Sequence, residues 1–256
     1  MAMPGKGPGS DVLSEGLAHF STILLTEQVK GEEQRMAFCK QIEDRYGNTR
    51  QRDSERPLVK VDGSLPGDRR VIYDRGGFVF WMLHQRLGRD ASLAALREYL
   101  RTYRDSRDHP LIEEYLAIMR RHATDSTAFD AFVKQWFFGT AVPQYLVTDA
   151  AVERAGSGWE VEARVKNVGT GEVPVEIAAA RGERFAKRRT AKNAWREARA
   201  ALTLAPGEEK PVTIRCAFEP QKLVVDPDVR VLMLERQKAE VKLKTRRQPG
   251  TAVAAR

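Results

Sequence analysis

Two short segments of this 256-residue chain place chemically versatile side chains next to glycine. Residues 11–20 read DVLSEGLAHF and contain Glu15, and residues 71–76 read VIYDRG and contain Tyr73. A carboxylate can hold a metal ion or a proton, and a phenol can donate a hydrogen bond to a developing negative charge. Taken singly, each has an ordinary explanation. The helix dipole favours a glutamate near a helix start, and a tyrosine there commonly packs in the core.

Other catalytic patterns are absent from the sequence. The chain has four histidines: His19, His84, His109 and His122. No two of them lie four residues apart, so the sequence contains no HExxH zinc motif. Asp11, Ser14 and His19 share one short segment, whereas the members of a catalytic triad come from separated elements. Neither a P-loop nor a GxGxxG segment is present.

Together, the two segments resemble the downstream half of the active site in the M1 (gluzincin) zinc aminopeptidase family. In that family, one helix with HExxH supplies two histidine ligands, and a second helix that begins near a Glu-Gly pair supplies the third ligand. Glu15, which precedes Gly16, matches that third ligand. A Tyr-x-Lys-Gly segment supplies the tyrosine that stabilises the oxyanion, and Tyr73-Asp-Arg75-Gly resembles it with Arg in place of Lys. The resemblance covers residues 8–146 and implies Glu15 as a metal ligand and Tyr73 as a catalytic residue.

The resemblance also implies what this sequence lacks. The family spacing would place the second zinc histidine about nineteen residues before Glu15, upstream of Met1. We therefore expect residues 1–10 to be the end of the connector between the two metal-binding helices. Zinc is the cofactor and a peptide is the substrate of a full-length relative, whose general-base glutamate and amine-binding glutamate would also lie upstream. Because one carboxylate cannot hold zinc against water, we expect this chain alone to bind no zinc and to be inactive.

The predicted site has a geometric consequence. The functional oxygens of Glu15 and Tyr73 should lie within about 10 Å of each other, since one bound carbonyl must reach both the zinc and the phenol. An exposed apolar groove should open beside them, where the upstream part would pack.

Two alternatives stay open. The chain could be a noncatalytic scaffold or binding module that keeps a peptidase-derived fold. It could also be the peptidase-like part of a fusion with an ABC-type permease, which some bacterial proteins contain. An in-frame HExxH upstream of Met1 would favour a truncated enzyme, whereas a stop codon would favour the scaffold.

Composition is that of a globular protein, with 42% hydrophobic residues. The densest apolar run, residues 78–83, is far shorter than the roughly 18 residues that a membrane span needs, and we expect its large side chains to form core. The first thirty residues lack the basic-then-apolar order of a secretory signal. Cys39 and Cys216 are isolated, so a CxxC metal site is excluded and a disulfide framework is not expected. Compartment and oligomeric state stay open.

The net charge of +8 belongs to the C-terminal part of the chain: residues 151–256 carry 22 Lys/Arg against 14 Asp/Glu, and residues 1–150 carry 21 of each. Eight basic residues cluster within residues 181–199: Arg181, Arg184, Lys187, Arg188, Arg189, Lys192, Arg196 and Arg199. Nucleic acid or an anionic membrane could bind such a stretch. A solvated loop or sheet face is the more common explanation, so we expect no nucleic-acid partner.

Hydrophobic periodicity predicts an α+β protein. Residues 11–45 and 74–138 show helical spacing, and a breaker-rich loop over residues 47–70 separates them. After Pro143 the pattern alternates, as in Trp159, Val161, Ala163 and Val165, and similar alternation occurs around Val175, around Val212 and at Val229, Val231 and Met233.

We therefore predict a helical part over residues 1–146, a β-sandwich over residues 147–243, which the short strands punctuated by Pro and Gly predict to be small and antiparallel, and a disordered tail over residues 244–256. The resemblance implies that the helical part is one half of a thermolysin-like peptidase catalytic domain, truncated at its N-terminus.

Overall fold

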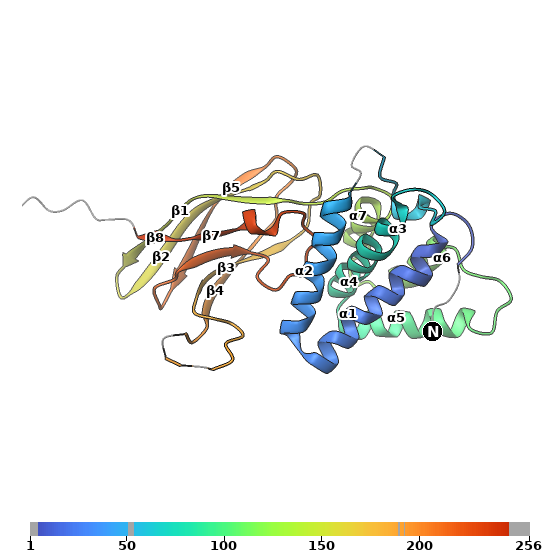
Figure 1. The fold of residues 1–256 in the computed structure, drawn as a ribbon, viewed down its shortest axis with the longest axis horizontal. Helices are drawn as coiled ribbons and strands as arrows, with labels where there is room; N and C mark the ends of the chain where they lie inside the picture. Colours follow the sequence, from blue (N-terminus) through green and yellow to red (C-terminus); the bar gives the residue numbers. More distant parts are fainter. Residues whose placement is uncertain (1–4, 51–53, 189, 192, 246–256) are drawn as a thin grey trace, which may run out of the picture. The chain divides into compact units, whose positions relative to one another are not determined.

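The structure is a computed structural model that describes residues 5–50, 54–188, 190–191 and 193–245. The chain separates into two compact units: Met1–Val142 with Asp228–Leu234, and Pro143–Pro227 with Glu235–Arg256. The first unit contains the α-helices and the second contains the strands (Figure 1). This arrangement confirms the predicted α+β class. The unit changes between Val142 and Pro143, ahead of the boundary expected after residue 146.

The helical unit contains π-turns, 3-10 turns and α-helices in this order: η1 (Val12–Gly16), α1 (Leu17–Lys30), α2 (Glu32–Thr49), η2 (Leu58–Lys60), α3 (Asp68–Arg70), η3 (Val71–Arg75), α4 (Gly76–Leu87), α5 (Arg89–Tyr103), α6 (Ile112–Arg121) and α7 (Ser126–Trp136). Gly31 ends α1 with φ 85° and Gly88 ends α4 with φ 82°, a conformation that glycine adopts without Cβ strain. The predicted loop over residues 47–70 begins later than expected, since α2 continues to Thr49, and η2 and α3 interrupt it.

Helix α4 is the centre of the core of the helical unit. From Phe78 to Leu83 every side chain is at most 4% exposed. A helix that is apolar on all faces is surrounded by other elements, and α4 packs against both α1 and α5. The predicted core role of the run at residues 78–83 is therefore confirmed.

A segment distant in sequence completes this unit. Asp228–Leu234 belongs to it, and the Nη1 of Arg35 on α2 donates hydrogen bonds to the carbonyls of Asp228 (2.6 Å) and Val229 (3.1 Å). The carboxylate of Glu43, also on α2, accepts the N–H of Met233 at 2.9 Å. Polar backbone groups of the segment thus bond to buried side chains of α2.

The predicted strand at Val229, Val231 and Met233 is wrong. Residues 229–233 form no strand, although all of them except Arg230 are buried. Val229 has φ 53°, in the left-handed region that β-branched residues rarely adopt. The alternating pattern therefore reflects burial of an irregular segment rather than a strand.

The second unit contains two four-stranded sheets, with strand orders β5-β2-β1-β8 and β4-β3-β6-β7. The strands are β1 (Tyr145–Ala155), β2 (Gly158–Asn167), β3 (Val175–Arg181), β4 (Arg196–Leu202), β5 (Glu209–Cys216), β6 (Lys222–Val225), β7 (Glu240–Lys242) and β8 (Lys244–Thr245). Neighbouring strands pair antiparallel, except that β8 runs parallel to β1.

The alternating runs predicted as strands include β2 and β5. Val161 and Val165 of β2 are buried, as are Val212 and Ile214 of β5, while their neighbours along each strand are more exposed. The predicted disordered tail is wrong at its first two residues, because Lys244–Thr245 forms β8. Residues 246–256 of that prediction lie outside the described residues.

Candidate active site

Glu15 and Tyr73 each lie in a π-helical turn, and the two turns contact each other. Glu15 belongs to η1 and Tyr73 to η3. In η3 the N–H of Gly76 reaches back five residues to the carbonyl of Val71, instead of four as in an α-helix. Single π-turns are rare and are frequently found at functional sites.

Glycines allow the two turns to approach closely. A Cβ on Gly76 would lie 3.6 Å from the Cα of Gly16, so the backbones meet at these two residues. A Cβ on Gly77 would lie only 2.6 Å from the Cβ of His19, a distance that real Cβ atoms do not tolerate. Gly16, which follows Glu15, and Gly76 and Gly77, which follow Arg75, therefore allow α1 and α4 to cross at close range.

The hydroxyl of Tyr73 lies between groups of opposite charge. A hydrogen bond to the carboxylate of Glu15 raises the pKa of the Tyr73 phenol, with burial and the negative charge of Glu15 adding to the effect. The guanidinium of Arg69 partly opposes this and lowers the same pKa. Both Glu15 and Tyr73 are half-buried. The structure thus places the two predicted site residues on turns that contact each other and adds Arg69, which the sequence did not single out.

His19 and Asp74 complete the surroundings of Tyr73. The Nδ1 of His19 lies 2.9 Å from the carbonyl oxygen of Tyr73 and 3.8 Å from the carboxylate of Asp74. Asp74 is buried and accepts hydrogen bonds from Arg45 at 2.7 and 3.2 Å. Neither role leaves a sequence motif, because His19 bonds to a backbone carbonyl and Asp74 pairs with an arginine 29 residues away.

Arg75, two residues after Tyr73, is fully buried. It donates a hydrogen bond to the carbonyl of Gly139 at 2.8 Å and lies 3.4 Å from the carboxylate of Glu55. Burial lowers the pKa of this guanidinium, although Tyr46 and Glu55 oppose the effect. Arg75 therefore anchors η3 to the helical core.

The described residues alone do not make a zinc centre. Within them, no three side chains of histidine, cysteine, aspartate or glutamate lie close enough together to hold a metal ion. A zinc site takes about four ligands, of which proteins usually supply three or more. Glu15 could contribute one carboxylate oxygen to such a site, and the expectation that this chain alone holds no zinc stays a prediction.

Helix α1 exposes an apolar stripe that continues from Glu15. Ala18, Thr22, Leu25 and Val29 recur at steps of three and four residues, which places them on one face of the helix. Leu25 is 63% exposed and Val29 is 76% exposed. Glu15 lies three residues before Ala18 and so shares that face.

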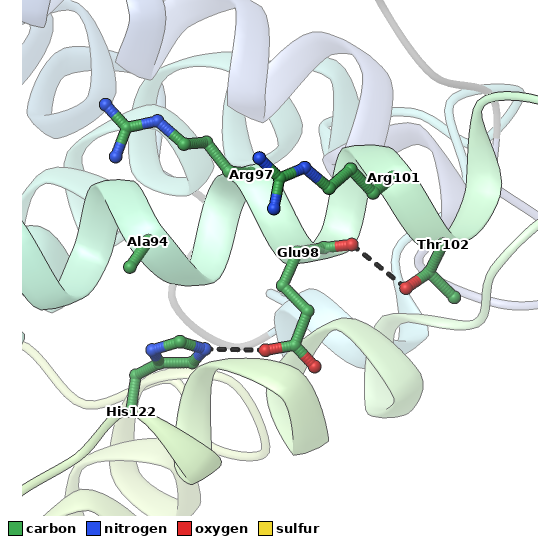
Figure 2. A pocket seen from close by; sticks show the side chains of 6 residues that line it. All are labelled: Ala94, Arg97, Glu98, Arg101, Thr102 and His122. Carbon is green, nitrogen blue, oxygen red and sulfur yellow. Dashed lines mark hydrogen bonds and ion pairs between the residues drawn. The ribbon is translucent and has the colours of Figure 1, made fainter.

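Figure 2 shows a different concavity of the helical unit, with a volume of about 450 Å³. It is lined by Ala94, Arg97, Glu98, Arg101, Thr102 and His122. Glu98 accepts hydrogen bonds from Arg121 and, at 2.6 Å, from Nε2 of His122, and these two partners lower its pKa. The lining side chains are exposed or half-buried, as on an ordinary solvated helix surface, and we assign this groove no catalytic role.

The described residues of the basic stretch 181–199 cover the end of β3, part of the connection that follows it and the start of β4, whereas Arg189 and Lys192 lie outside the described residues. Arg199 pairs with Glu176 at 2.6 Å and Glu197 at 2.8 Å, and Arg181 lies 3.5 Å from Glu219. These pairs reduce the positive field that nucleic acid would recognise. Over the part of the chain that the structure describes, no helix is long and apolar enough to cross a membrane.

No protein-family model matches the sequence, and comparison with curated proteins finds no match. Among solved structures, the chain is similar to a CARDB domain from Pyrococcus furiosus in complex with di-metal ions (18% identity, 41% of this chain and 90% of that chain, TM-score 0.29). It is also similar to a β-glucosidase from Listeria innocua in complex with glucose (16% identity, 41% of this chain and 16% of that chain, TM-score 0.27). Both scores are below 0.5, so neither structure informs the fold or the function of this chain.

Proposed function

We propose that this chain is part of a zinc aminopeptidase of the gluzincin type, to which it contributes the metal ligand Glu15 and the catalytic residue Tyr73. The observation that carries the proposal is the contact between the two turns that hold Glu15 and Tyr73, with the Glu15 side chain close enough to raise the pKa of the Tyr73 phenol. It joins two segments that are far apart in the sequence but adjacent in the family's active site. A peptide carbonyl bound beside Glu15 would lie within reach of the phenol.

Tyr73 has the properties of a hydrogen-bond donor to an oxyanion. A phenol is ordinarily protonated at neutral pH, and the Glu15 carboxylate raises the pKa of Tyr73 further, so the hydroxyl keeps a hydrogen to donate. Donors aimed at charge that develops only in the transition state contribute roughly 10²–10³ in rate. In such an enzyme, zinc supplies the activated water, and Glu15 offers one oxygen to the metal.

The exposed stripe on α1 supports a further packing partner beside Glu15. Leu25 and Val29 lie on the face that continues from Glu15 and would be covered by another helix. We propose that this helix carries HExxH, and with it two histidine ligands and the general base, outside the 256 residues. The 256-residue chain alone is then inactive, because it holds one ligand of three.

The test is to express the chain together with the coding sequence that precedes it and to measure bound zinc and the hydrolysis of aminoacyl anilides. We expect zinc-dependent hydrolysis, which Glu15→Gln should abolish together with zinc binding, since a third of the protein ligands is lost. Tyr73→Phe should keep zinc and lower kcat by roughly 10²–10³.

Two matched controls belong to this test. Glu33→Gln changes an exposed glutamate on α2, and Tyr103→Phe changes a half-buried tyrosine on α5, so neither should alter zinc binding or turnover. Chelator-sensitive hydrolysis by the 256-residue chain alone, or full turnover by Tyr73→Phe, would contradict the proposal.

The second candidate function is a noncatalytic scaffold derived from a peptidase. The same experiment separates the two functions. If the preceding sequence contained no HExxH and the extended protein bound no zinc, the result would support the scaffold function.

A further inference from the structure

We infer that His19 is a positioning residue that holds Tyr73 in register with Glu15. This inference rests on the proposed function of the Glu15–Tyr73 pair. His19 contacts the backbone of Tyr73, so it acts through that residue and not on the substrate.

The hydrogen bond between His19 and Tyr73 has a defined direction. A carbonyl oxygen only accepts, so Nδ1 of His19, 2.9 Å from the Tyr73 oxygen, must carry the hydrogen. Within the turn, the N–H of Gly76 is shared between the Tyr73 and Val71 carbonyls. Nδ1 of His19 gives the Tyr73 carbonyl a donor from the neighbouring helix α1.

Glu15 and His19 bind opposite ends of the same residue. They lie four residues apart, one helical turn, so both project from the same side of the η1–α1 segment. The Glu15 side chain faces the Tyr73 hydroxyl and raises its pKa, while Nδ1 of His19 donates a hydrogen bond to the Tyr73 carbonyl at 2.9 Å. Two attachments from one rigid turn fix both the position and the orientation of the phenol, which a single contact to the hydroxyl could not do.

The imidazole itself is held on several sides. Its ring meets the rings of Tyr73 and Phe38 edge to face, at 5.9 and 5.7 Å between centroids. Gly77 leaves the space that the Cβ of His19 occupies, and the carboxylate of Asp74 lies 3.8 Å from Nδ1. A side chain confined in this way is suited to defining a geometry.

The test compares two amide substitutions in the 256-residue chain. In His19→Asn the amide nitrogen can take the place of Nδ1, whereas in His19→Gln it extends to the place of Nε2. The readout is the pKa of Tyr73, measured by ¹⁹F NMR of protein labelled with 3-fluorotyrosine, with and without Glu15→Gln. The Tyr73→Phe variant assigns the resonance.

We expect His19→Asn to keep the wild-type dependence of the Tyr73 pKa on Glu15 and His19→Gln to lose most of it. If His19→Gln does not fold, His19→Ala serves as the variant without a donor. Equal behaviour of the Asn variant and the variant without a donor would overturn the inference, as would loss of cooperative thermal unfolding in both. The measurement of the Tyr73 pKa needs neither zinc nor substrate, so its outcome does not depend on the result of the peptidase test.

Discussion

At the scale of single residues, the Tyr73 hydroxyl is a reporter of its own surroundings. The carboxylate of Glu15 raises its pKa and the guanidinium of Arg69 lowers it. We therefore expect Glu15→Gln to lower the pKa of Tyr73 and Arg69→Ala to raise it, as followed by ¹⁹F NMR titration. Tyr103, whose pKa is raised by burial and by Glu114, should not respond to either change. Shifts of the same sign in both variants would show that the hydroxyl does not lie between the two charges.

His84 supplies a prediction about acid. It is 4% exposed, its Nδ1 has no hydrogen-bond partner among the described residues, and its ring stacks on Trp81. Burial, helped by the charge of Arg89, lowers its pKa from 6.5 to about 4. Between these two pH values the unfolded chain binds a proton that the folded chain refuses, so stability falls as the pH falls, by up to about 1.4 kcal/mol per pH unit.

Urea unfolding at pH 7 and at pH 5 measures this loss. In His84→Phe the difference in unfolding free energy between the two pH values should be smaller than in the wild type. His109→Phe, which changes an exposed histidine, should leave the difference unaltered. An unchanged difference in His84→Phe would mean that His84 takes up its proton in the folded protein.

Residue types and spacing were enough to select Glu15 and Tyr73, because their neighbours form recognisable segments. They were not enough to select His19 or Arg69. His19 bonds to a backbone carbonyl, and Arg69 acts on the hydroxyl of a side chain one helical turn away. Such partners depend on the path of the backbone, which hydrophobic periodicity does not describe.

At the scale of elements, the crossing of α1 and α4 depends on the absence of a Cβ. In Gly77→Ala the new Cβ would lie 2.6 Å from the Cβ of His19, so the helices must separate. We expect a loss of about 1–3 kcal/mol in the unfolding free energy and a Tyr73 pKa closer to its ordinary value.

Gly47→Ala is the matched control for this substitution. Gly47 is also helical, but its Cβ would meet the nearest atom, a backbone oxygen, at an ordinary 3.4 Å. Because alanine favours the helix, this variant should gain up to about 1 kcal/mol. Chemical denaturation measures the unfolding free energy of both glycine variants. Equal changes in the two would show that the crossing of α1 and α4 is not tightly packed.

The helices of the first unit and strands β2 and β5 follow from periodicity, because burial on one face imposes it. Strand β3 follows only in part, because residues 177–180 are all buried. The π-turns and strands β1 and β4 do not follow from periodicity. The burial of β1 and β4 does not alternate strictly, and an extra residue in a helix shifts the apolar pattern by less than one turn. The irregular segment at residues 229–233 shows the converse, an alternating sequence without a strand.

At the scale of the whole molecule, the helical unit is assembled from two separate stretches of chain. Arg35→Met would leave the carbonyls of Asp228 and Val229 without their buried donor, at an expected loss of about 2–4 kcal/mol. Hydrogen exchange and limited proteolysis should show faster opening of residues 228–234. Arg97→Met, at an exposed position on α5, should change stability by less than about 0.5 kcal/mol. Unaltered hydrogen exchange of residues 228–234 in Arg35→Met would show that Arg35 does not hold this segment on the helical unit.

The return of Asp228–Leu234 to the helical unit also sets the timing of its folding during translation. A ribosome that adds about 5–20 residues per second needs on the order of ten seconds to pass from Val142 to Leu234. During that interval Arg35 and Glu43 lack these backbone partners, and the surface that Met233 covers faces the solvent. The helical unit is synthesised first, but it can reach its native state only after β1–β6 have been synthesised. Until then its core is incomplete and accessible to chaperones.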